Sequence, residues 1–102
     1  MIGKGVHLPR TPRIYLAAFT SGDSKSSQLD CQAVAEDGEG LAECSSPDLE
    51  SAKNGIGLTS STNHNLYAAH YPDGYELEWV NDPATHPGWQ RALKRNRAKT
   101  TL

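Results

Sequence analysis

The chain has 102 residues, of which 36% are hydrophobic and 22% charged, and its formal net charge is -2. This length fits one small domain, and so low a net charge is not typical of an intrinsically disordered chain. The longest apolar run, Ile14 to Phe19, is too short to span a bilayer. We therefore expect a soluble, cytoplasmic protein with no membrane partner.

Charge is divided unevenly along the chain. Residues 1–15 carry three cations and no acid, residues 87–102 carry five cations, and residues 16–86 carry a net charge of -10. We divide the single domain into a basic arm at 1–12, an acidic α+β body at 13–86 and a basic helix or tail at 87–102. Such asymmetry fits basic ends that contact nucleic acid, an acidic body that binds a basic partner, or ends that fold back onto the body.

The first half of the body predicts three strands. An apolar segment at 13–20 predicts a buried strand, and the polar segment 21–27 predicts a loop. Alternating residues at 28–36 and 39–45 predict a hairpin around Asp37-Gly38. A two-residue turn there sets Cys31 opposite Cys44, whereas a four-residue loop would separate them. The pair can form a disulfide or remain two small buried thiols.

The second half predicts a short helix followed by more strands. Ser46 is the expected N-cap of a helix over 46–55, with Pro47 at its first position, and 56–61 predicts a weak strand. Residues 66–80 predict a second hairpin around Pro72-Asp73-Gly74, which places His70 opposite Glu76.

The C-terminal segment predicts a helix over 89–99. Trp89, Ala92 and Leu93 share one face, and Thr85 or His86 together with Pro87 can begin the helix. The fold class is therefore α+β. We expect a small antiparallel sheet of about five to six strands built from hairpins, one short internal helix and a basic C-terminal helix.

Chemically suggestive residues are few. His70 with Glu76, and His64 nearby, could perform the acid-base chemistry of a small metal-independent ribonuclease. His64, His70 and the two cysteines do not have the spacing of a zinc site, and the glycines form no phosphate loop. We predict no cofactor, no metal and no catalytic residues as the main interpretation, with the ribonuclease as an alternative.

Cations of the C-terminal helix define a second alternative, which is binding of nucleic acid. Phosphate contacts of this kind would make binding strongly dependent on salt. The residues concerned are Arg91, Lys94, Arg95, Arg97 and Lys99.

Carboxylates of the first hairpin and the following helix define the main prediction, a non-enzymatic interaction protein that binds a basic, nucleic-acid-binding surface of a protein partner. Its small size and charge are analogous to those of inhibitors carried by phages and mobile elements, anti-CRISPR proteins included. The predicted partner-binding residues are Asp30, Glu36, Asp37, Glu39, Glu43, Asp48 and Glu50.

Overall fold

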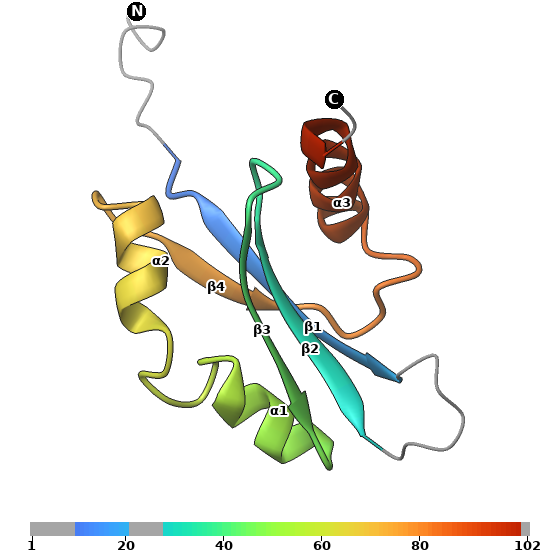
Figure 1. Ribbon diagram of the computed structural model, residues 1–102. Helices are drawn as coiled ribbons and strands as arrows, with labels where there is room; N and C mark the ends of the chain where they lie inside the picture. The colour runs from blue at the N-terminus through green and yellow to red at the C-terminus, as the bar shows by residue number, and fades with distance from the viewer. Residues whose placement is uncertain (1–9, 21–27, 101–102) are drawn as a thin grey trace, which may run out of the picture.

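The computed structural model describes residues 10–20 and 28–100. They form a four-stranded mixed sheet and three helices rather than five to six antiparallel strands with two helices (Figure 1). In the sheet, of order β3-β2-β1-β4, β4 is parallel to β1 and the other neighbours are antiparallel. The elements are β1 (Arg13–Thr20), β2 (Leu29–Ala35), β3 (Gly40–Ser46), α1 (Leu49–Gly55), α2 (His64–His70), β4 (Glu76–Trp79) and α3 (Pro87–Thr100).

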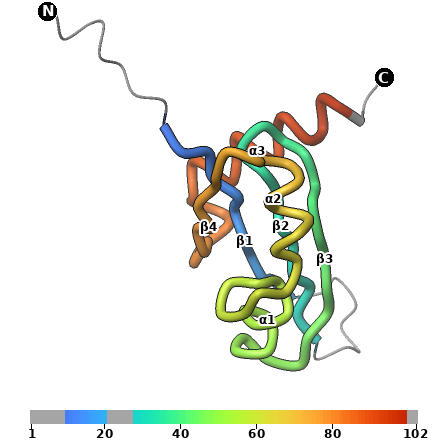
Figure 2. Tube along the Cα trace, turned by 90° about the vertical axis from the view of Figure 1, so that its left-hand side faces the viewer, coloured from blue at the N-terminus to red at the C-terminus, as the bar shows by residue number. Residues whose placement is uncertain are grey.

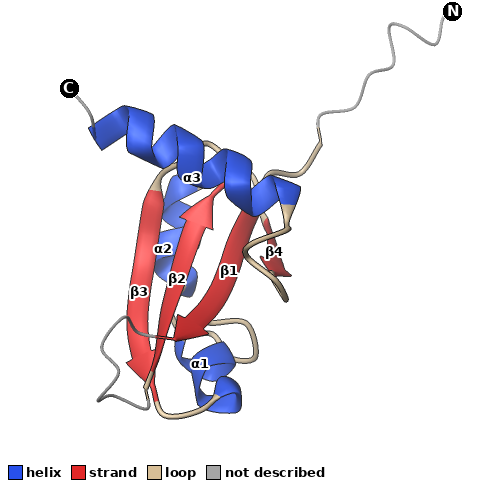
Figure 3. Cartoon of the chain, turned by 90° about the vertical axis from the view of Figure 1, so that its right-hand side faces the viewer, coloured by secondary structure: helices blue, strands red, loops and turns tan. Residues whose placement is uncertain are grey.

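Helices cover both faces of the sheet. Figure 2 shows α1 and α2 in front of the strands, and Figure 3 shows α3 on the opposite side. Strand β1 is buried on both faces because successive side chains alternate. Ile14 and Leu16 pack beneath α1 and α2, whereas Tyr15 and Ala17 pack beneath α3. The apolar run that predicted a buried strand is thus the strand shared by two small cores.

The first hairpin is confirmed, with a correction at its turn. Ala35 and Glu39 are hydrogen-bonded through their backbones, so the turn contains three residues rather than two, and Gly38 adopts a φ of 98°. A bulge in the register next to Val34 takes up the extra residue. Cys31 consequently faces Cys44 as predicted, and both thiols are free.

Helix α1 is confirmed, but its cap is not Ser46. The carboxylate of Asp48 accepts a hydrogen bond of 2.8 Å from the Ser51 N–H, which makes Asp48 the N-cap. Ser46 stays in β3, paired with Leu29, because the following proline favours an extended backbone at the residue before it. Residues 56–61 form turns and bends, not the predicted strand.

The second predicted hairpin is wrong. Residues 64–70 form α2, and Glu76–Trp79 form β4, which pairs in parallel with β1 rather than with residues 66–70. Seven residues are too few to distinguish a period of two from a helical period, since Tyr67 and Tyr71 also lie one helical turn apart. Two alanines in this segment favour the helix, and Tyr67 becomes its buried residue.

Helix α3 is confirmed, with Pro87 as its first residue. His86 precedes it and caps it, because the ring Nδ1 accepts a hydrogen bond of 3.0 Å from the Trp89 N–H. Trp89 and Ala92 are buried against the sheet and Leu93 packs beside them, as the apolar stripe predicted. None of the helices in the described part of the chain is long and apolar enough to cross a membrane.

Candidate functional site

Helix α3 crosses only one end of its face of the sheet, near the β2–β3 turn, and the described residues leave the other end uncovered (Figure 3). The strand register determines which side chains occupy this open face. One row across the strands consists of Phe19, Asp30 and Ser45, and the next row contains Gln32 and Glu43. The open face is therefore mostly polar, and both of its charged residues are acidic.

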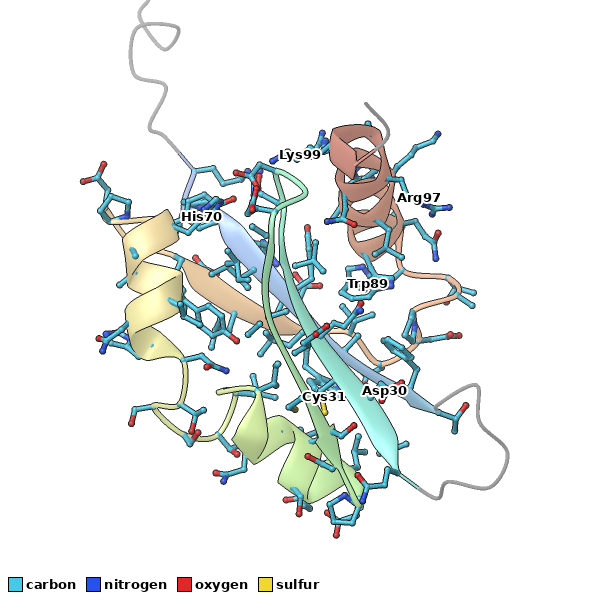
Figure 4. The ribbon with its side chains drawn as sticks, viewed as in Figure 1. Asp30, Cys31, His70, Trp89, Arg97 and Lys99 are labelled. Atoms are coloured by element: carbon cyan, nitrogen blue, oxygen red, sulfur yellow. The ribbon has the colours of Figure 1, made fainter. Side chains whose placement is uncertain are left out.

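Two cavities of about 400 and 430 Å³ adjoin on this face, and both are lined by Gln32 and Glu43. The first extends under α3 to Leu93 and Asn96, and the second extends to Phe19 and Asp30. We call this continuous depression the sheet groove. Figure 4 shows Asp30 on β2, well away from the basic end of α3.

Among residues 10–20 and 28–100, no cation pairs with the carboxylates of the sheet groove. Asp30 accepts a hydrogen bond of 3.2 Å from the Ser45 hydroxyl. Glu43 is exposed and has no hydrogen bond or ion pair with any described residue. The sheet groove thus offers two carboxylates to an incoming cationic group, and the predicted residues Asp30 and Glu43 lie together there.

Three further predicted carboxylates lie at the β2–β3 turn, where they contact basic residues of the same chain. Glu36 pairs with Arg10 at 2.6 Å, Asp37 pairs with His70 at 2.8 Å, and Glu39 lies 3.5 Å from the Lys99 Nζ. Burial of Asp37 opposes its ionisation, but the Glu39 N–H and the His70 ring together hold its pKa below the ordinary value. These acids already have partners within the fold, so they are less available to an incoming group than Asp30 and Glu43.

The last two predicted carboxylates belong to α1, on the other side of the sheet. Asp48 caps the helix, and its bond to Ser51 lowers its pKa. Glu50 is exposed in the first turn, next to the cap. The structure therefore places the seven acids in three separate locations.

Basic residues of α3 divide into two groups. Arg95 donates a hydrogen bond of 2.6 Å to the Glu36 carbonyl, and Lys99 approaches Asp37 and Glu39, so both hold the helix against the β2–β3 turn. Figure 4 shows Lys99 directed toward this turn and Arg97 directed outward. Arg91 and Lys94 are exposed. The basic helix therefore folds back onto the acidic body in part.

The residues of the ribonuclease hypothesis are not brought together. His70 bonds to Asp37, and His64 lies 2.7 Å from the Tyr75 hydroxyl. Glu76 alternates with Leu77, which packs beneath α1 and α2, so Glu76 lies on the α3 side of the sheet. The predicted pairing of His70 with Glu76 is corrected because residues 66–70 are helical and β4 pairs with β1.

Sequence reasoning missed a three-residue polar network beside α3. Glu78 accepts hydrogen bonds from Arg13 and from the His86 Nε2, the latter at 2.6 Å. Burial of Glu78 opposes ionisation, but His86 and Arg13 together lower its pKa. Since the His86 Nδ1 is occupied by the cap of α3, this imidazole has a structural role. No local motif could reveal the network, because its members come from β1, β4 and the connection before α3.

Of the two thiols that face each other across β2 and β3, the Cys31 thiol is unreactive. Burial and the neighbouring Cys44 raise the pKa of Cys31 to about 12, so its thiol stays protonated.

No group of three or more potential metal ligands occurs among residues 10–20 and 28–100. Comparison with protein-family models, with curated proteins and with solved structures gave no match.

Proposed function

We propose that this protein is a non-catalytic binding protein whose sheet groove binds a basic, extended segment of a protein partner. The observation that carries the proposal is the pair of adjoining cavities that share Glu43, a carboxylate with no ionic partner among the described residues. A lysine or arginine placed there would meet an acidic site that no cation of the described part of the chain already occupies.

Apolar side chains beside the acids define the rest of the expected ligand. Phe19 lies next to Asp30, and Leu93 lines the end of the sheet groove near α3. An extended segment with cationic and apolar side chains on the same face would satisfy both. Protein surfaces that hold nucleic acid are rich in lysine and arginine, which supports a nucleic-acid-binding protein as the partner class.

The edge of the sheet favours an extended ligand. Within the described residues, β3 pairs only with β2, so one side of its backbone remains open to another strand. A strand added along β3 would form main-chain hydrogen bonds and direct alternate side chains toward the sheet groove. This arrangement explains how a shallow, polar depression can bind a peptide in a fixed register.

The proposal is tested by titrating the isotope-labelled protein with a synthetic peptide that carries lysine and valine on the same face of its extended chain. We expect amide resonances of β3, Gln32 and Asp30 to shift, and we expect Glu43→Lys to weaken binding by at least about tenfold, because it places a cation opposite a cation.

Glu50→Lys is the matched control, since it makes the same charge change at an exposed carboxylate on α1. Its affinity for the peptide should stay close to that of the natural protein. Equal losses in the two variants would show that only the net charge matters and would refute a specific site, as would peptide-induced shifts confined to other parts of the fold.

A further inference from the structure

A second, smaller cavity lies on the other side of α3 from the sheet groove. Its volume is about 190 Å³, and it is lined by Arg10, Tyr15, Glu36, Gly88, Arg91 and Arg95. Three arginines and one glutamate therefore line this cavity, which gives the lining an excess of positive charge. We call it the arginine cavity.

The carboxylate in the arginine cavity already has its own partners. Glu36 accepts hydrogen bonds from Arg10 at 2.6 and 3.3 Å and from the Arg13 N–H at 2.6 Å. Burial opposes its ionisation, but these donors hold its pKa below the ordinary value. One carboxylate that is ionised and saturated with donors cannot neutralise all three arginines.

Two polar groups of the lining have no such partner among the described residues. Neither Arg91 nor the Tyr15 hydroxyl makes a hydrogen bond to a described residue. Arg95 gives one hydrogen bond to the Glu36 carbonyl, and a guanidinium has five N–H donors. The arginine cavity thus contains donors from two elements, β1 and α3, that no described residue uses.

Gly88 allows these donors to converge. A Cβ atom at this position would lie 2.5 Å from the Tyr15 hydroxyl oxygen, so only glycine lets the tyrosine reach past the start of α3. Gly88 is also the second residue of α3, where a backbone N–H has no acceptor within the helix. The helix terminus adds a partial positive charge to the same place.

The volume of the cavity restricts the ligand to a small group. At about 30 Å³ for each water in the liquid, it holds roughly six waters, whereas pockets for drug-sized molecules start near 300 Å³. Guanidinium groups match the oxygen atoms of tetrahedral oxyanions through paired hydrogen bonds.

We propose that the arginine cavity binds a phosphate group, with Arg91 and the Tyr15 hydroxyl as its unoccupied donors and Arg95 as a third contact. The group can come from inorganic phosphate or from a small phosphate monoester, and both present the same oxygen atoms. This site is independent of the sheet groove and of the peptide proposed to bind there.

The test is a titration of the isotope-labelled full chain with inorganic phosphate and, separately, with O-phosphoserine, at constant ionic strength. We expect saturable shifts at Gly88, Arg91 and Arg95 with at least one of the two. Tighter binding of phosphate identifies the free ion as the preferred ligand, and tighter binding of phosphoserine identifies the ester.

Arg91→Gln should weaken binding at least tenfold, and Tyr15→Phe should weaken it severalfold, since each removes one unoccupied donor. Lys94→Gln is the control, because it removes an exposed cation of α3 that does not line the cavity. Unchanged spectra away from the cavity confirm that the variants fold. Shifts that never saturate, or equal losses in Arg91→Gln and Lys94→Gln, would show general screening by anions and overturn the proposal.

Discussion

A single buried hydroxyl connects α2 to the turn after α1. Tyr67 is 1% exposed, and its hydroxyl donates a hydrogen bond of 2.6 Å to the Ile56 carbonyl. Burial raises the pKa of this phenol to about 12, so the donor proton is retained at any physiological pH. The side chain therefore contributes both apolar packing and one polar contact in the core beneath α1 and α2.

Replacing Tyr67 with phenylalanine is expected to lower the free energy of unfolding by about 1–3 kcal/mol, because the Ile56 carbonyl would lose its donor in a buried place. Urea unfolding measures the loss. Tyr75→Phe removes a hydroxyl whose bond to His64 is exposed to water, and it should have a smaller effect. Losses of the same size in both variants would argue against a buried polar contact at Tyr67.

At the scale of elements, the β2–β3 turn and α3 depend on each other. The Asn96 side chain donates a hydrogen bond of 2.9 Å to the Gly38 carbonyl, and Arg95 bonds to the neighbouring Glu36 carbonyl. A Cβ atom on Gly38 would lie 2.6 Å from the Cβ of Arg95. The turn and the helix are therefore in direct contact, and this contact fixes the end of α3 that bears Lys99.

We expect Gly38→Ala to be more destabilising than Gly74→Ala. Both glycines have positive φ, 98° and 122°, so alanine is strained at either position. Only Gly38 also meets another element, since nothing lies within 4 Å of a Cβ built on Gly74. Overpacking against α3 should make the loss in free energy of unfolding about 1–3 kcal/mol larger for Gly38→Ala, and urea unfolding measures this difference. Equal destabilisation would show that α3 moves aside without cost.

At the scale of the molecule, three carboxylates hold basic segments from both ends of the chain to the body. Glu36 bonds to Arg10, Asp37 to His70 with Lys99 nearby, and Glu78 to Arg13 and His86. All three have pKa values below the ordinary ones. The uneven charge along the sequence is in this way partly balanced within the fold.

These lowered pKa values predict loss of stability in acid. Because the carboxylates hold protons less readily in the folded state, the unfolded chain takes up protons first as the pH falls. Their contribution is complete above the unfolded values, about 4.3 for Glu and 3.9 for Asp, and disappears as the pH falls through the lower folded values. Thermal melts should show a constant Tm from pH 6 to 5 and a decline below about pH 4.

The double variant Glu36→Gln, Glu78→Gln provides the comparison. It should be less stable than the natural protein at pH 6, and its Tm should fall less between pH 5 and 3, because two of the titrating groups are gone. Parallel curves for the two proteins would mean that other groups control the acid transition.

Local patterns in the sequence determined β1, the first hairpin and α3. The signals were an apolar run for β1, an Asp-Gly turn for the hairpin and an apolar stripe after a proline for α3. Each signal lies within a few consecutive residues, so these elements could be predicted without knowing any distant contact. The same reasoning proposed Asp30 and Glu43 as partner-binding residues together with five acids that lie elsewhere in the structure, and this assignment stays a prediction.

Only the tertiary structure decided what residues 64–79 form. Their pattern of tyrosines and alanines suits a strand or a helix, and the choice depends on Tyr67 packing under the sheet and on β4 pairing with β1, about 60 residues away in sequence. The sheet groove and the arginine cavity have the same origin. Each is formed where α3 meets strands from the other half of the chain. Local patterns in the sequence do not predict contacts between residues so far apart.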